Sequence, residues 1–139
     1  MKLPAKFRYA VRILIELGID DRQFLSLSQV EKSQNISAKF AKQILQPLQI
    51  NGLVEGKRGT KGGYYLKKSP REINLLNIYQ ALGEELKPAP CLDEQEDCGR
   101  VDYCGAKSAW EELHKLLLDF FKRMTIEDLM IKERSLRIR

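Results

Sequence analysis

The sequence lacks the residues from which most catalytic sites are built. A single histidine occurs among its 139 residues, which leaves little for acid–base catalysis. No nucleophile, base and orienting group stand together. The glycine-rich stretch RGTKGG at 58–63 does not have the spacing of a P-loop and falls between two predicted strands, so it is not expected to cradle a nucleotide. We therefore predict that the protein is not an enzyme.

Long apolar runs are also missing. None approaches the length that spans a membrane, and the start MKLPAKFRYAV has no apolar signal core ahead of a cleavage site. There is no internal repeat, and the chain is long enough for one domain with its own core plus an appendage. We expect a cytoplasmic protein that does not engage membranes and that folds without disulfide bonds.

Cysteine is scarce and unevenly placed. All three cysteines lie in CLDEQEDCGRVDYC, residues 91–104. The cytoplasm keeps thiols reduced, and an odd number of cysteines in one short segment favours metal binding or redox chemistry over a disulfide framework. The surrounding residues 84–104 contain seven acidic and two basic side chains and two prolines, which predicts an irregular acidic loop.

The net charge of +5 is divided between two unlike halves. Residues 1–73 contain 14 Lys/Arg and 6 Asp/Glu, whereas residues 74–139 contain 10 and 13. The N-terminal half is therefore the candidate for binding a polyanion. A solvated basic surface is the simpler explanation of this charge on its own.

Hydrophobic periodicity predicts three helices followed by a hairpin. A first helix covers 5–19 and stops at GIDD; a second, with Ser28 as N-cap and Glu31 as its capping-box partner, ends near Gln34. Ser37 caps a third helix, which Pro47 should bend or shorten and Gly52 should end. Two β-prone runs, 53–55 and 64–66, flank a basic glycine-rich loop. A helix-turn-helix followed by a basic hairpin is a winged helix, and the helix predicted at 74–82 should pack back on it.

The C-terminal part predicts a long amphipathic helix. From Ser108 onward, apolar residues recur at alternating three- and four-residue spacing, with Leu116 and Phe121 widening the stripe. So wide a face on a terminal helix needs a partner, and its central residues are Trp110, Leu113, Leu117 and Phe120. Thr125 should cap a further short turn through Asp128, before a frayed basic end. The predicted fold class is mainly α with a small β-hairpin wing: a winged helix-turn-helix domain (1–85), a cysteine-bearing loop (86–107), and a dimerisation helix with its tail (108–139).

The predicted winged helix suggests a way to read DNA. The second helix of a helix-turn-helix enters the major groove by its N-terminal part, where lysine can donate to guanine and glutamine can pair with adenine. Here that part carries Ser37, Lys39, Lys42 and Gln43. A wing-tip arginine suits the narrow minor groove of A-tracts, and the wing loop carries Lys57, Arg58 and Lys61. The alternative is a solvated hairpin whose glycines only make turns.

Several stretches together resemble one protein family. They are MKLPAKFRYAVRIL, ISAKFAKQILQPLQINGLV, the wing KRGTKGGYYL with SPREINLLNIYQAL after it, and three cysteines ahead of a tryptophan-bearing helix. This pattern is similar to the Rrf2 (Rrf-two) family of bacterial winged-helix regulators, which includes iron-sulfur and nitric-oxide-sensitive members. The resemblance implies a homodimer, formed through the long C-terminal helix, on an imperfectly palindromic double-stranded DNA site. It also implies that Lys39, Phe40, Lys42 and Gln43 hold recognition-helix positions and that Arg58 holds the wing-tip position. We interpret Phe40 as structural, because it belongs to the apolar stripe.

The resemblance also implies that Cys91, Cys98 and Cys104 are ligands of an iron-sulfur cluster, with the two-iron and four-iron forms both open. Clusters usually have four ligands. The family's two known positions for the fourth ligand are occupied here by Lys107 and Arg8. His114 is better explained as a boundary or solvated residue. An oxygen ligand could come from Asp93, Glu94, Glu96, Asp97 or Asp102, or water or a small molecule could bind instead.

Other interpretations of the cysteines and of the charged surface remain open. The thiols could form a redox switch without a cluster, could bind zinc, or could be ordinary side chains, although the C-x₂₋₄-C hook of structural zinc sites is missing. The whole protein could instead be a metal or electron carrier whose basic face docks an acidic protein, or an interaction protein whose stripe binds another helix. Salt-dependent binding to a DNA duplex would separate a regulator from both.

Overall fold

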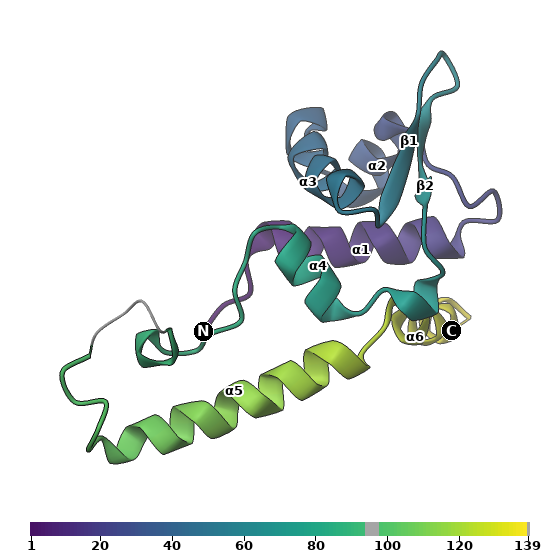
Figure 1. Cartoon of the computed structure of the whole chain (residues 1–139). Helices are drawn as coiled ribbons and strands as arrows, with labels where there is room; N and C mark the ends of the chain where they lie inside the picture. Colours follow the sequence, from purple (N-terminus) through teal and green to yellow (C-terminus); the bar gives the residue numbers. More distant parts are fainter. Residues whose placement is uncertain (94–97, 139) are drawn as a thin grey trace.

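The computed structural model describes residues 1–93 and 98–138 and confirms the predicted fold class (Figure 1). Six helices, two strands and two short 3₁₀ turns follow one another along this part of the chain. In order they are α1 (Ala5–Ile19), α2 (Leu27–Gln34), α3 (Ala38–Ile50), β1 (Val54–Lys57), β2 (Gly63–Leu66), η1 (Pro70–Glu72), α4 (Leu75–Ala81), η2 (Pro90–Leu92), α5 (Gly105–Arg123) and α6 (Ile126–Arg137).

The start of α2 differs from the prediction. Ser26, not Ser28, is the N-cap: its hydroxyl accepts a hydrogen bond from the backbone of Gln29, whose side chain accepts one from the backbone of Ser26. The predicted capping box is therefore present, but it is formed by Ser26 and Gln29, two residues earlier than predicted. The helix ends at Gln34 as predicted, and Asn35 follows in the left-handed conformation.

The end of α1 also has a different cause from the one predicted. Gly18 does not stop the helix but lies inside its last turn, and Asp20 is the C-cap. A Cβ on Gly18 would overlap the side chain of Met130 in α6. This glycine therefore serves the close approach of α1 and α6, which sequence spacing within α1 could not reveal.

Helix α3 begins as predicted but continues past its proline. The hydroxyl of Ser37 accepts a hydrogen bond from the backbone of Phe40 at 3.1 Å. Pro47 does not shorten the helix. Only one turn of α3 follows it, and hydrogen bonds from Asn51 stabilise that turn. There the Asn51 side chain donates to the carbonyl of Pro47 at 2.7 Å and to that of Ala81 in α4 at 3.3 Å. The Asn51 side chain thus adds a second hydrogen bond to a carbonyl that already accepts from the Asn51 backbone, and it ties α3 to α4.

The wing is an antiparallel hairpin in which Val54 pairs with Leu66 and Lys57 with Gly63. Leu25, from the segment before α2, exchanges backbone hydrogen bonds with Tyr64 at 2.8 and 3.0 Å, which attaches the hairpin to the helix-turn-helix. At Gly63 a Cβ would overlap the carbonyl of Leu25 and the ring of Phe24. This position therefore needs glycine for a close approach of two backbones.

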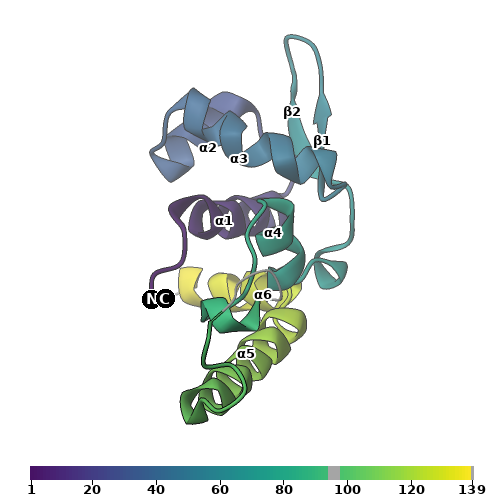
Figure 2. The same ribbon diagram turned by 60° about the vertical axis from the view of Figure 1, so that its left-hand side comes forward.

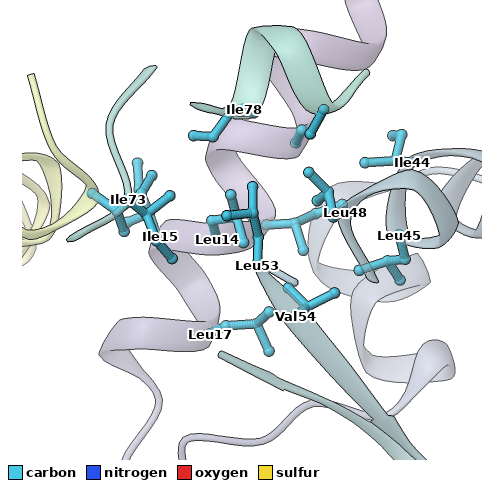
Figure 3. Close-up of a cluster of buried hydrophobic side chains, with 14 of the residues drawn as sticks. Leu14, Ile15, Leu17, Ile44, Leu45, Leu48, Leu53, Val54, Ile73 and Ile78 are labelled. Atoms are coloured by element: carbon cyan, nitrogen blue, oxygen red, sulfur yellow. The ribbon is translucent and has the colours of Figure 1, made fainter. Parts of the chain in front are cut away.

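The core lies between α1, α3, α4 and the base of the wing (Figure 3). Its side chains are aliphatic and almost wholly buried; the ones labelled in the figure are Leu14, Ile15, Leu17, Ile44, Leu45, Leu48, Leu53, Val54, Ile73 and Ile78. Phe40 is half-buried, with its ring 5.6 Å from that of Tyr9. The apolar face predicted for residues 40–48 therefore packs inward, and the opposite face of α3 is free.

The C-terminal helices are fastened to this domain by backbone and aromatic contacts. Ile126 donates to the carbonyl of Ile73 at 2.8 Å, and Leu75 donates to that of Met124 at 3.0 Å. Phe121 is only 4 % exposed and stacks on Phe7 at 5.7 Å. Phe121 therefore belongs to the chain's own core. The prediction that it widens the exposed stripe was wrong.

Helix α6 is longer and better anchored than the predicted frayed end. Thr125 caps it as expected, accepting from the backbone of Asp128, and the carboxylate of Asp128 accepts in return from the backbone of Thr125 at 3.0 Å. This hydrogen bond from the backbone lowers the pKa of Asp128. The helix continues to Arg137, because Met130 packs against α1 and Glu133 pairs with Arg137 at 2.9 Å.

Candidate DNA-binding surface and cysteine pocket

The polar face of α3 is exposed and lies away from the long helix α5. Figures 1 and 2 agree that α2, α3 and the hairpin occupy one side of α1, with α5 and α6 on the other. The predicted base-reading residues Ser37, Lys39, Lys42 and Gln43 are all exposed. Their helix is held from behind by Ile44, Leu45 and Leu48, so its outer face is presented rigidly.

The wing projects beyond the helices on the same side (Figures 1 and 2). Lys57, Arg58 and Lys61 are exposed in or beside its loop. Within the described structure, neither these cations nor Lys39 and Lys42 form an ion pair with a carboxylate. A surface with unpaired cations on two neighbouring elements suits a phosphate backbone.

A hollow of about 520 Å³ separates the wing from the start of α2. Sequence reasoning found the two wing cations that line it but missed its other polar residues. Those include Ser26, Ser28, Gln49 and Thr60. Ser26, the N-cap of α2, and Ser28, in its first turn, were a usable signal, since the N-terminus of a helix offers free backbone N–H groups.

Glu55 is the acidic residue in the hairpin strands, and Tyr65 faces it across the hairpin. A hydrogen bond with Glu55 raises the pKa of Tyr65. The pair lies in the strands, whereas the three cations lie in or next to the loop. The basic character of the wing is therefore concentrated at its tip.

The three cysteines come from three different local structures and line one pocket. Cys91 lies in η2, Cys98 opens a turn in which its carbonyl accepts from Val101 at 3.0 Å, and Cys104 is the N-cap of α5. The pocket has a volume of about 220 Å³, and its other walls are Ala89, Pro90, Val101, Lys107 and Trp110. No set of three His, Cys, Asp or Glu side chains in the described ranges, 1–93 and 98–138, is arranged to hold a metal ion.

The two residues at the family's positions for a fourth ligand, and the single histidine, lie in different places. Lys107 lines the pocket with the thiols, and its ammonium lies 3.6 Å from the carboxylate of Glu111. His114 lines a separate hollow with Glu84, Glu85 and Lys87. Arg8 donates to the carbonyl of Leu3 at 3.2 Å. His114 and Arg8 do not line the cysteine pocket.

The acidic candidates in the loop do not line the pocket where they are described. Asp93 lies 3.7 Å from the ammonium of Lys87, and Asp102 is exposed. A hydrogen bond with Glu85, helped by Asp93, raises the pKa of Lys87. Glu94, Glu96 and Asp97 lie outside the described residues.

Helix α5 carries an apolar stripe that the described chain leaves uncovered. Trp110 is 42 % exposed and Phe120 is 41 % exposed; Leu113 is also exposed, and Leu117 is half-buried. Trp110 belongs to this stripe and also to the wall of the cysteine pocket. The cysteine pocket and the apolar stripe, which were predicted in separate segments, therefore share the side chain of Trp110.

A family model described as an iron-dependent transcriptional regulator, Rrf2, matches residues 3–132. The chain belongs to the Rrf2 family. One relative, the HTH-type transcriptional regulator IscR of Pectobacterium carotovorum subsp. carotovorum, is 30 % identical over 131 residues, which are 94 % of this chain and 79 % of that protein.

Solved structures of regulators in the Rrf2 family share the fold. CymR, the global cysteine regulator of B. subtilis, matches with a TM-score of 0.77 and 28 % identity, covering 95 % of this chain and 98 % of that one. IscR of T. potens matches with a TM-score of 0.75 and 25 % identity, covering 96 % and 88 %. The relatives are transcriptional regulators, which confirms the prediction of a non-enzyme. Within 1–93 and 98–138 no helix is both long and apolar enough to cross a bilayer.

Proposed function

We propose that this Rrf2-family regulator binds duplex DNA as a homodimer and that an iron-sulfur cluster, held by Cys91, Cys98 and Cys104, sets its affinity for DNA. In this scheme residues 1–85 read an imperfectly palindromic site, 86–107 hold the cluster, and 108–139 dimerise. The observation that supports it best is the pocket lined by all three thiols, one wall of which is Trp110 of the apolar stripe.

The DNA-reading part assigns different tasks to α3 and to the wing. Lys39, Lys42 and Gln43 would contact base edges in the major groove, with Ser37 positioned at the first turn of the helix. Lys57 and Lys61 would contact phosphates, and Arg58 would enter the minor groove. Their exposure and the rigid packing behind α3 support this assignment.

The chemistry of the cysteine pocket fits an iron-sulfur cluster. Thiolates are the usual protein ligands of such clusters, and the walls formed by Pro90, Val101 and Trp110 would limit the access of water. A bound cluster would supply a redox-active and ligand-sensitive cross-link among three segments of one loop. Sensitivity to iron supply, oxidation or nitric oxide would follow from the chemistry of the cluster.

A cross-link in this loop could affect DNA binding because of where the loop lies in the chain. It connects α4, which packs on the DNA-reading domain, to α5, which carries the proposed dimer stripe. Residues 84–104 also contain five more acidic than basic side chains. Ordering the loop would therefore fix both the spacing of the two DNA-reading domains and the position of this negative charge. Allosteric couplings are typically about 1–3 kcal/mol, so DNA affinity would change about 5- to 150-fold.

The test is a titration of one operator, selected from random duplexes, with three preparations at a fixed salt concentration. They are the anaerobically purified protein with its iron and sulfide content measured, the apo protein, and a Cys98→Ala variant. We expect the first to differ from the other two by the factor given above. Identical curves for all three, with a cluster verified in the first, would leave a DNA-binding protein that does not sense through this loop.

A thiol switch without a cluster is the second candidate. It is favoured by the likeness to CymR, whose Staphylococcus aureus form has been solved as an oxidized form, and by the lack of a metal-ligating set of three among the described side chains. Two of the three thiols would form a disulfide, passing two electrons and two protons to an oxidant such as peroxide. Protein that contains no iron after anaerobic purification, and whose DNA affinity changes on oxidation and recovers on reduction, would establish this candidate instead.

A further inference from the structure

One basic residue lies among the thiols and apolar groups that line the cysteine pocket. Among the described residues that line it, Lys107 is the single charged side chain; the others are thiols or apolar groups. Lys107 belongs to the first turn of α5, of which Cys104 is the N-cap, and its backbone N–H donates to the carbonyl of Cys104 at 3.3 Å. The helix therefore fixes the lysine next to a thiol.

Lys107 lines the pocket and also forms an ion pair with Glu111. Its side chain is 28 % exposed, whereas that of Glu111, at 3.6 Å, is 49 % exposed and does not line the pocket. An ion pair exposed to this extent contributes little and is screened by salt. The positive charge of Lys107 is therefore only partly offset, and its apolar stem forms part of the pocket wall.

We propose that Lys107 makes the thiol pocket selective for small anions. A sulfur that reacts as its thiolate repels an approaching anion, and a cation beside it reduces that repulsion. An exchangeable ligand that joins the three cysteines, whether at a cluster or at the thiols themselves, would then be a small anion from solution. The biological meaning of this inference rests on the proposed function. The selectivity for anions is a property of the apo protein, so it can be measured without a cluster.

The first measurement uses charged and neutral alkylating reagents on the reduced apo protein. The same sulfur attacks the CH₂ carbon of iodoacetate or iodoacetamide: a carbon–sulfur bond forms, the carbon–iodine bond breaks as iodide leaves, and the thiol proton passes to the buffer. The ratio of the two rate constants, resolved for each cysteine by mass spectrometry, therefore reports the local potential. We expect Lys107→Gln to lower the iodoacetate-to-iodoacetamide ratio about 1.5- to 5-fold, the range for partly exposed charges. Glu111→Gln should raise it.

The control variant is Lys115→Gln, which removes an exposed lysine from the same helix without touching the pocket. It should leave the ratio unchanged, and Lys107→Arg should keep the ratio of the unsubstituted protein. The preference for iodoacetate should also shrink as salt is raised from about 0.05 to 0.5 M, because the Debye length shortens.

The second measurement uses the only tryptophan in the chain, Trp110, which lines the same pocket. Iodide and caesium ions quench its fluorescence from solution, and at constant ionic strength the anion should quench it more strongly. Lys107→Gln should reduce quenching by iodide and increase quenching by caesium. An unchanged alkylation ratio and unchanged quenching in Lys107→Gln would refute the proposal, as would an equal effect of Lys115→Gln; neither result would bear on whether the protein holds a cluster.

Discussion

Phe120 and Phe121 are adjacent on α5 but have opposite surroundings, and this contrast tests the proposed dimer. Phe121 is 4 % exposed and packs between Phe7 and Tyr79, whereas Phe120 is 41 % exposed. If the exposed stripe is the dimer interface, Phe120→Ala should weaken the dimer and leave the fold of each protomer intact. Phe121→Ala should destabilise the protomer itself, by about 3–5 kcal/mol for a buried phenylalanine.

The exposed fraction of Phe120 gives the expected size of the dimer effect. Complete burial of a phenylalanine side chain contributes about 1.5–3 kcal/mol, and 41 % of the side chain is still available for burial. That is about 0.6–1.2 kcal/mol per copy, and a twofold dimer contains two copies. The dimer Kd should therefore rise about 7- to 60-fold.

Sedimentation over a range of protein concentrations measures the dimer Kd, and urea unfolding at one fixed concentration measures the stability of the fold. Leu117→Asp, which puts a charge in the same stripe, should give monomers with an unchanged circular dichroism spectrum. Lys122→Ala, on the same helix, is the matched control and should change neither quantity. A dimer that survives both Phe120→Ala and Leu117→Asp would show that the interface is formed by another surface.

Two further predictions concern the wing and the start of α6. Arg58→Ala should weaken DNA binding by about 1–3 kcal/mol and relax the preference for A/T pairs near the wing. Titration of operator variants measures both effects, and Arg71→Ala, at an exposed position, is the control. An equal loss of affinity on every sequence would mean that Arg58 contacts only phosphate. Thr125→Ala should lower the free energy of unfolding by about 0.5–2 kcal/mol, because α6 loses its cap. Thr125→Ser should stay close to the unsubstituted protein. Equal urea midpoints for the two variants and the unsubstituted protein would show that the capping box contributes nothing to stability.

Local patterns in the sequence were enough to predict the order of the elements. The apolar spacing within 5–19 and 38–48, Ser37 as a cap and the two β-prone runs around a glycine-rich loop each depend on contacts between residues close in the chain. The resemblance to the Rrf2 family rested on the same stretches and is confirmed. The error at Ser28 arose because two serines could open a capping box, and the contact with Gln29 decided for Ser26. The error at Gly18 arose because its reason is a contact with Met130 of α6, which is distant in the sequence.

Periodicity and composition are properties of single segments, so a winged helix, a loop with every cysteine and a helix with an apolar stripe could be predicted from the amino-acid sequence. The burial of Phe121 beside an exposed Phe120 depends instead on contacts between distant segments, since α1 and α4 supply the aromatic rings that cover Phe121. The same holds for the cysteine pocket. Three thiols, Lys107 and Trp110 share it because η2, a turn and the first turns of α5 meet there, and such meetings depend on how the chain folds back on itself.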